Sequence, residues 1–223
     1  MLNRTLETIT GGKAGVEIGG PSNDTGGHVY RLAGSMDNVV YSKNTVWNLA
    51  GDMYEYYPGR TGKVIINDAV NISNVDDEAY DFCFSSHCLE HIANPLKAVK
   101  EWLRIVKTGG HMVIIVPEKT MCFDHKRSVT PFSTLLTQYE RDVGEDDLSS
   151  LPEILRNHDL TMDLPAGNFE QFTRRSLDNF QNRCLHHHVY SPELLKEICA
   201  HFKCQYVYTM TEGINIWFVM KKI

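Results

Sequence analysis

The chain has 223 residues, of which 42% are hydrophobic, and a formal net charge of −6. This length is enough for one well-filled α/β domain and short for two, so we expect residues 1–223 to form a single domain. The negative charge argues against a broad nucleic-acid surface, which needs clustered Lys and Arg.

Strand-like and helix-like segments alternate through the first half of the chain, a pattern typical of a parallel sheet covered by helices. The sequence predicts five strands in this half. They are "AGVEIGG", "NVVYS" from Asn38, "KVIINDA" from Lys63, "YDFCFSSH" from Tyr80 and "HMVIIVP" from His111.

The clearest predicted helix is "NPLKAVKEWLRIVKTGG", which begins after Asn94. Asn94 is a good N-cap, and Pro95 suits the first helical position. Apolar residues recur at spacings of three and four, and Gly109-Gly110 ends the helix.

Between residues 118 and 190 this periodicity breaks down. Helices are still expected there in "TPFSTLLTQYERD", "DDLSSLPEILRNH" and "NFEQFTRRSLDNFQNRC". The chain then returns to regular elements, with a capped helix in "SPELLKEICAHF" and two strands, "CQYVYTMTE" and "GINIWFVMKK", which we expect to pair as a terminal antiparallel hairpin.

Membrane and disulfide signals are weak. No apolar run approaches the roughly 20 residues that span a bilayer, and "MLNRTLETITGGK" lacks the apolar stretch of a signal peptide. We therefore expect a soluble, cytoplasmic protein without a membrane span. The six cysteines are scattered without a C-x-x-C pair, which favours reduced structural thiols over a cysteine zinc site.

A glycine turn, "GGPSND", follows the first predicted strand. Glycine lets the backbone approach a ligand closely at the carboxyl end of a sheet, although a plain strand-to-helix turn is the alternative. A P-loop and the dinucleotide fingerprint are excluded by their missing residues. Glu17 beside the turn and Asp68 after the third strand suit a ligand that carries an ammonium group. Together these acids indicate S-adenosylmethionine, with its amino-acid end and its adenine amino group.

The segment "YDFCFSSHCLEHIANPLKAVKEWLRIVKTGGHMVIIVP" resembles class I S-adenosylmethionine-dependent methyltransferases, which read here as strand, "LEH", proline, helix, "K-x-GG" and strand. With "VEIGG" and "NDA", the motif order covers about the first half of the chain. The closing helix and strands are similar to the reversed seventh strand of that family. The resemblance implies a Rossmann-like α/β fold with a seven-stranded, mostly parallel sheet, a reversed last strand and S-adenosylmethionine as cofactor.

The resemblance also implies which turns hold the cofactor. Two departures stand out. Pro21 replaces a spaced glycine of the first motif. The second strand lacks the acid that would hold the ribose, so either a neutral group (Tyr41, Ser42 or Asn44) or Asp37 must serve. The cofactor-binding residues predicted in this way are Glu17, Gly19, Gly20, Pro21, Ser22, Asp37, Ser42, Asn44, Asp68, Ala69, Ser85, Ser86 and His87.

Glu90 and His91 of "LEH" could be read as an acid/base pair. Because they lie at the start of a helix, we expect a capping or packing role instead.

Residues 118–190 follow the carboxyl end of the fifth strand, on the same rim as the cofactor turns. We therefore expect them to form a largely helical lid, inserted after strand 5, that holds the substrate. In many members of the family an N-terminal helical extension forms the lid, whereas here the first strand starts near Val16.

Within this insertion, "FDHKR" offers His125 as a base for methyl transfer to oxygen, since its ordinary pKa lies near working pH. Asp124 would stabilise the imidazolium if the two side chains meet. Lys126 and Arg127 could hold an anionic group of the substrate, and a solvated charged turn is the alternative.

"RCLHHHVY" places three histidines in a row, of which His186 and His188 could share one face of a strand. A metal site built from them with Asp124 or His125 is an alternative, but we predict no metal. The predicted catalytic residues are His125, Asp124 and His187, and the predicted substrate-binding residues are Lys126, Arg127, Arg174, Arg175, His186 and His188.

The pattern "FDHKRSVTPF…EDDL…NRCLHHHV" resembles a bacterial subgroup of these methyltransferases that often occurs in surface-polysaccharide gene neighbourhoods. This resemblance implies O-methylation of a sugar or nucleotide-linked sugar. Methylation of an amine or acid group, and a non-catalytic cofactor-binding module, are the alternatives. We expect a small polar acceptor as partner and no nucleic acid, with a homodimer left open.

Overall fold

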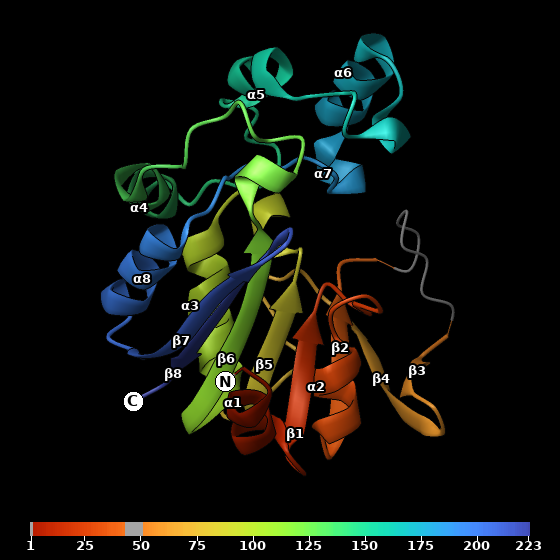
Figure 1. The fold of residues 1–223 in the computed structure, drawn as a ribbon, viewed down its shortest axis with the longest axis vertical. Helices are drawn as coiled ribbons and strands as arrows, with labels where there is room; N and C mark the ends of the chain where they lie inside the picture. The colour runs from red at the N-terminus through yellow and green to blue at the C-terminus, as the bar shows by residue number, and fades with distance from the viewer. Residues whose placement is uncertain (1, 43–50) are drawn as a thin grey trace.

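A computed structural model describes residues 2–42 and 51–223 and shows one eight-stranded sheet with helices on both faces (Figure 1). The strand order is β3-β4-β2-β1-β5-β6-β8-β7. The strands are β1 (Ala14–Ile18), β2 (Ser35–Val40), β3 (Met53–Tyr57), β4 (Arg60–Ile66), β5 (Tyr80–Ser86), β6 (Val106–Pro117), β7 (Gln205–Glu212) and β8 (Asn215–Lys221).

The middle of the sheet is parallel and its ends are antiparallel. β1 pairs in parallel with β2 and β5, β2 with β4, and β5 with β6. β8 runs antiparallel to β6, and β7 pairs antiparallel with β8. The predicted Rossmann-like sheet with a reversed last strand and a terminal hairpin is therefore confirmed.

The sheet has one strand more than the seven expected, because β3 forms a hairpin with β4 at the edge. Its sequence, "MYEYY", alternates between the two faces: Tyr54 and Tyr56 are buried, whereas Met53 and Glu55 are exposed. This alternation is the period-2 pattern of a half-buried strand. It was missed because aromatic residues in so short a segment give a weak signal.

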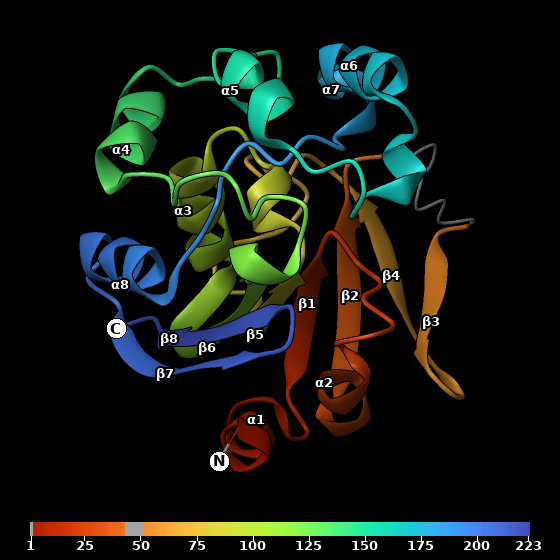
Figure 2. The same ribbon diagram turned by 45° about the horizontal axis from the view of Figure 1, so that its top comes forward.

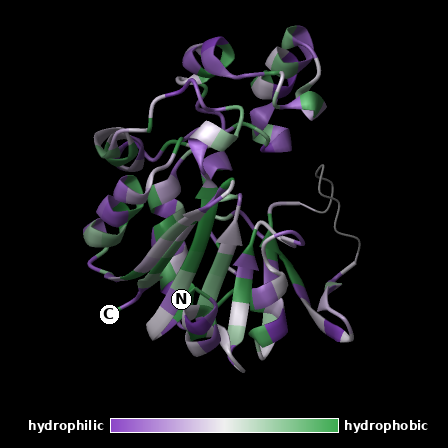
Figure 3. Cartoon of the chain, in the orientation of Figure 1, coloured by the Kyte–Doolittle hydropathy of each residue, from purple (hydrophilic) through white to green (hydrophobic). Residues whose placement is uncertain are grey.

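Among the residues that the structure describes, two helices lie on each face of the sheet. On one face, α1 (Leu2–Thr10) and α2 (Gly27–Leu32) pack on apolar side chains such as Phe82, Phe84 and Val113. On the other, α3 (Pro95–Ile105) and α8 (Pro192–His201) pack on the alternate positions of the same strands. Hydrophobic residues are accordingly concentrated along the central strands (Figure 3). In the described residues, no helix has the length and apolar character needed to cross a membrane.

Helix α3 begins as predicted, because the Asn94 side chain accepts a hydrogen bond from the Lys97 backbone N–H at 3.2 Å. Its buried face carries Leu96, Val99 and Trp102. The Trp102 indole donates a hydrogen bond to the Ala69 carbonyl at 2.9 Å. This bond ties α3 to the segment that follows β4, at the rim where the cofactor residues are expected.

Residues 118–190, called the lid below, lie over the carboxyl ends of the parallel strands, whereas α1 lies at the opposite end of the sheet (Figures 1 and 2). The lid is largely helical, as expected, and has a small apolar cluster of its own around Ile154 and Phe172. Its elements are η2 (Lys119–Met121), α4 (Phe132–Glu140), α5 (Leu151–Asn157), η3 (Leu164–Ala166), α6 (Phe169–Leu177) and α7 (Asn179–Asn182).

Candidate functional site

A cavity of about 580 Å³ lies where the lid meets the carboxyl ends of the strands. Its volume is typical of small-molecule sites. The segment after β1 contributes residues 19–25, and the segments around the ends of β2 and after β4 contribute Val40, Tyr41, Ser42, Asp68 and Ala69. Around the end of β5 the lining residues are Ser86, His87, Cys88, His91 and Ile92, and at the start of β8 they are Ile214 and Asn215. The lid contributes Glu145 and Arg183.

The glycine turn forms one wall of this cavity. Gly19 has a φ of +84°, which favours glycine, and a Cβ there would lie 2.5 Å from the Cys88 sulfur. A Cβ on Gly20 would lie 2.0 Å from the carboxylate carbon of Glu17. The backbone therefore lines the cavity directly, and Pro21 follows Gly20 through a cis peptide bond.

Glu17 lies beneath the turn rather than in the cavity wall. It is fully buried, and its carboxylate accepts hydrogen bonds from the Ser22 backbone N–H at 3.0 Å and from the Tyr30 hydroxyl at 2.7 Å. Burial raises the pKa of Glu17 to about 7. We expected this carboxylate to meet the cationic part of the ligand, whereas the structure has it holding the turn in place.

Asp68 and Ala69 line the cavity as expected. The Asp68 carboxylate accepts a hydrogen bond from the Val70 backbone N–H at 3.1 Å and forms an ion pair with Arg183 of the lid at 3.2 Å. Arg183 also lies 3.4 Å from the Glu145 carboxylate, and its guanidinium carbon is 3.9 Å from the centre of the Tyr41 ring. The sequence does not predict Arg183 or Glu145 as site residues. Both lie in polar segments in which no motif distinguishes one residue from its neighbours.

After β2, the neutral residues Tyr41 and Ser42 line the cavity, and the alternative acid, Asp37, does not. Asp37 accepts hydrogen bonds from the Lys63 backbone N–H at 2.9 Å and from the Tyr80 hydroxyl at 2.8 Å. Successive side chains of a strand point to opposite faces, so it is Asn38 that faces the turn, where it accepts a hydrogen bond from the Gly20 N–H at 3.2 Å. The predicted residue Asn44 lies outside the described residues.

At the end of β5, Ser86 and His87 line the cavity, whereas Ser85 is buried and bonded to the Ile18 carbonyl at 3.3 Å. The His87 ring has its Nε2 2.7 Å from Asn215 Oδ1 and its Nδ1 3.6 Å from Glu90 Oε1. Burial lowers the pKa of His87, so the imidazole is neutral near pH 7.

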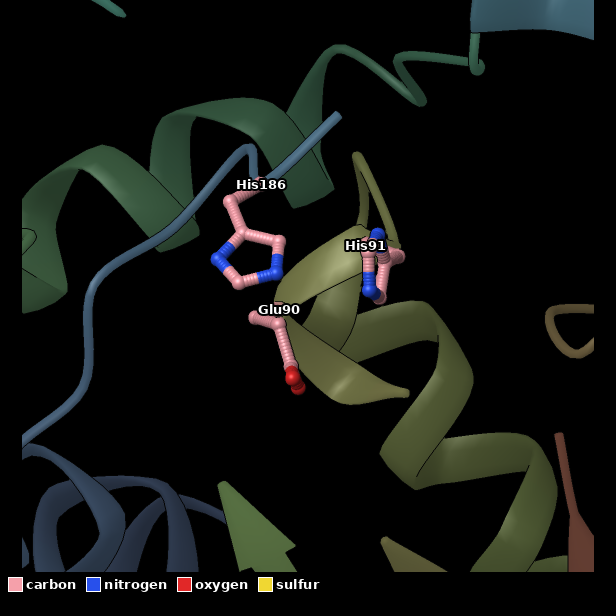
Figure 4. A group of neighbouring side chains, drawn as sticks. All are labelled: Glu90, His91 and His186. Carbon is pink, nitrogen blue, oxygen red and sulfur yellow. The ribbon is translucent and has the colours of Figure 1, made fainter. Parts of the chain in front are cut away.

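Glu90 and His91 form the turn η1 (Leu89–His91) just before α3. We expected them to cap or pack a helix, but Asn94 caps α3 and the His91 ring lines the cavity. Glu90 is 1% exposed, and burial raises the pKa of its carboxyl to about 8. His186 of the lid lies against this turn, with its ring centre 4.5 Å from that of His91 (Figure 4).

The expected pairing of Asp124 with His125 is wrong. Asp124 is buried and lies 2.6 Å from His186 Nδ1 and 2.9 Å from the Arg127 guanidinium. His125 points elsewhere: its Nε2 is 2.9 Å from Asp159, which also pairs with Lys126 at 2.9 Å, and neither basic residue lines the cavity. Adjacent side chains in this turn diverge, so sequence neighbours do not meet.

Arg127, expected to bind substrate, is instead buried within the lid. It donates hydrogen bonds to the backbone carbonyls of His186 and His187 at 2.8 and 3.2 Å. It also forms an ion pair with the Glu153 carboxylate at 3.1 Å. These bonds fix the returning strand-like segment in place.

The other histidines and arginines expected at the site also lie outside the cavity wall. His187 Nε2 contacts the Asn179 amide at 3.0 Å, and His188 Nε2 lies 3.2 Å from the Ala93 carbonyl. Arg175 pairs with Asp163 at 3.0 Å. Arg174 lies in a shallow groove on α6.

Comparison with known proteins agrees with this geometry. Residues 32–114 match the family model described as a methyltransferase domain. A search of curated proteins found no match to the sequence.

Solved structures with the same fold include an S-adenosylmethionine-dependent methyltransferase from Mesorhizobium loti (10% identity, TM-score 0.57, covering 99% of this chain and 96% of that one). A second is an S-adenosylmethionine-dependent methyltransferase from Aquifex aeolicus (12% identity, TM-score 0.55, covering 99% of this chain and 87% of that one). A third, from Thermotoga maritima, is described as a possible histamine N-methyltransferase (15% identity, TM-score 0.53, covering 99% of this chain and 87% of that one).

The residues present fit S-adenosylmethionine. Because Gly19 and Gly20 have no Cβ, the turn packs directly on Cys88 and Glu17, and its backbone lines the cavity where the methionine part of the cofactor would lie. Asp68, with Tyr41 and Ser42, supplies hydrogen-bonding groups for adenosine on the neighbouring wall. Residues 32–114 thus match a methyltransferase domain, the chain has the fold of solved S-adenosylmethionine-dependent methyltransferases, and the residues of the cavity fit S-adenosylmethionine as the cofactor.

Proposed function

We propose that the protein methylates a hydroxyl group of a small polar acceptor, a sugar or a nucleotide-linked sugar. The observation that carries this proposal is the cavity itself, which extends from the glycine turn to a wall formed by His87, His91, Glu145 and Arg183. Such a wall suits a hydroxylated acceptor better than an apolar one. The sugar is favoured by the resemblance of the lid sequence to the polysaccharide-associated subgroup.

Bound S-adenosylmethionine supplies a methyl group on a positively charged sulfur, and the acceptor hydroxyl loses its proton as its oxygen takes up that methyl group. His87 is the residue assigned to receive the proton. Its ring lines the cavity beside the glycine turn and is one-third exposed. The Asn215 side chain, whose Oδ1 lies 2.7 Å from the ring Nε2, orients the ring.

The lid residues at the cavity would hold the rest of the acceptor. Arg183 is already balanced by the carboxylates of Asp68 and Glu145, which favours neutral hydroxyl groups over an anion at this point. Hydroxyl groups can donate to the carboxylates and accept from the guanidinium.

A second candidate acceptor is an amine. The cavity lining includes the acids Asp24, Asp68 and Glu145, which would attract an ammonium group. An amine that reacts in its neutral form needs no strong base, so its methylation would survive loss of His87.

A labelled-methyl assay tests the proposal. Purified protein is incubated with S-adenosylmethionine carrying a labelled methyl group and a panel of free sugars, nucleotide sugars and small amines, and products are identified by mass spectrometry. A methylated sugar is the expected product. A methylated amine would favour the second candidate, and cofactor binding by calorimetry without transfer to any acceptor in the panel or in cell extract would argue for a non-catalytic module.

A further inference from the structure

The Glu90 carboxylate is buried without the hydrogen bonds that a buried acid normally has. It is 1% exposed, and neither oxygen has a hydrogen-bond partner among the described residues. The 3.6 Å separation between Oε1 and His87 Nδ1 is too long for a hydrogen bond. Because burying an unpartnered polar group costs free energy, this carboxylate points to a missing ligand.

Two imidazoles lie beside this carboxylate. One ligand atom from each of Glu90, His91 and His186 can be chosen so that all three lie within 4.8 Å of one another (Figure 4). The two segments are joined by the hydrogen bond from the His187 N–H to the Glu90 carbonyl at 2.8 Å. Bonds of about 2.0–2.2 Å to one ion would draw these ligand atoms closer together than 4.8 Å.

The orientation of the His186 ring is fixed by its neighbours. Its Nδ1 lies 2.6 Å from Asp124 Oδ2 and donates its hydrogen to that carboxylate, so Nε2 is the ring nitrogen left to face a metal ion. Arg127 pairs with the other oxygen of Asp124 at 2.9 Å and is itself buried. A carboxylate behind the distal nitrogen is the usual support of a metal-binding histidine.

We propose that Glu90, His91 and His186 bind a divalent transition-metal ion of the Zn²⁺ class. Two imidazoles and one carboxylate suit such ions, whereas Mg²⁺ and Ca²⁺ prefer oxygen ligands alone. Of the three residues, His91 lines the cavity, so an ion held here would border the space that an acceptor would occupy. A role in catalysis rests on the proposed methyl transfer, whereas binding of the metal does not.

Metal binding is tested on tag-free, full-length protein that has been dialysed against a chelator. Zn²⁺ is added, and uptake is measured by elemental analysis and calorimetry; Co²⁺ is added separately, and its visible absorption reports nitrogen and oxygen coordination. The variants are E90Q, H186A and D124N, with H201A as the control, since His201 is exposed on α8. Circular dichroism checks that each variant is folded.

Wild-type protein and H201A should bind about one equivalent of Zn²⁺, with a Co²⁺ spectrum that Zn²⁺ abolishes. E90Q and H186A should lose this binding, and D124N should weaken it by about 10–100-fold. Should H186A fail to fold, E90Q decides, because Gln preserves the shape of Glu. The inference is overturned by uptake below about one-tenth of an equivalent in the wild type, or by E90Q binding Zn²⁺ as tightly as H201A.

Failure of the metal site and failure of the proposed function are distinguishable. Calorimetry with S-adenosylmethionine on chelator-treated protein reports the cofactor site alone. Methyl transfer by a wild-type protein that does not bind Zn²⁺ would overturn the proposed metal site and leave the proposed function standing. Zn²⁺ binding without transfer to any acceptor would remove the proposed function and leave the metal site.

Discussion

The guanidinium of Arg183 in the lid lies 3.2 Å from the carboxylate of Asp68 at the end of β4, so the lid and the sheet are joined across the cavity. The same guanidinium packs on the Tyr41 ring and pairs with Glu145. One lid residue thus contacts two of the segments that line the cavity, one after β2 and one after β4.

Replacing Arg183 by Ala should therefore weaken binding of S-adenosylmethionine by about tenfold. An ion pair and a cation–π contact are each worth about 1 kcal/mol at a partly exposed site, and only part of this sum acts through the cofactor. Isothermal titration calorimetry measures the change. R174A, on the outer side of α6, is the matched control and should bind like the wild type; an unchanged affinity in R183A would show that the lid contact does not support the cofactor.

Two glycines should respond in opposite ways to substitution by Ala. A Cβ at Gly20 would lie 2.0 Å from the Glu17 carboxylate carbon, so G20A should lose cofactor binding and several kcal/mol of stability. At Gly27, the first residue of α2, a Cβ meets nothing within 4 Å, and G27A should be neutral or stabilising by up to about 1 kcal/mol. Thermal unfolding with and without the cofactor separates the two, and equal melting temperatures would contradict the described turn.

Glu17 should make folding depend on pH. Its pKa is about 7 in the folded protein, compared with an ordinary value of 4.5. Between pH 4.5 and 7, the folded state therefore keeps a proton on Glu17 that the unfolded chain has released. Stability should therefore fall as pH rises from 4.5 to 7 and level off above that range. Between pH 5 and 7 the loss from this group is about 2 kcal/mol.

Urea unfolding of the wild type and E17Q at both pH values measures this loss. Gln carries no titrating proton, so the difference in unfolding free energy between the two proteins should shift by about 2 kcal/mol in favour of E17Q as pH rises. A constant difference would mean that the Glu17 carboxylate is charged when buried.

His87 and His125 give contrasting predictions for turnover. H87A should lower kcat by about 10²–10⁴-fold and leave cofactor affinity within a few fold, because the ring lines the cavity beside the glycine turn. H125A should retain turnover, since its ring pairs with Asp159 outside the cavity wall. Steady-state kinetics with the acceptor found in the labelled-methyl assay decides between them; a reversed order would restore His125 as the base.

The sheet and its glycine turn could be predicted because their signals are local. Strand periodicity, the Asn94 cap and the turn after β1 each depend on residues within a few positions of one another. The choice between Asp37 and its neighbours was harder, because a shift of one residue in a strand moves a side chain to the other face. Asn38 faces the turn for this reason, and Asp37 faces Tyr80.

The lid side of the site could not be predicted in the same way. Its contacts join residues that are far apart in the chain, such as His186 with Asp124 and Arg183 with Asp68. In the turn after β6, the histidine next to Asp124 in sequence is not the one that contacts it. These pairs are brought together by the three-dimensional path of the insertion. No repeating sequence pattern indicates that path.

The lid leaves the sheet after Pro117 and is followed by α8, and its residues Thr130 and Val189 lie next to each other. The Thr130 N–H donates a hydrogen bond to the Val189 carbonyl at 2.9 Å, and the Val189 N–H returns one to the Thr130 hydroxyl at 3.0 Å. A segment that is closed in this way, here residues 131–188, can change in length and composition without moving the strands beneath it. Grafting this segment between sheets of the same fold should therefore leave the glycine turn in place, while it replaces Glu145 and Arg183, the two lid residues that line the cavity.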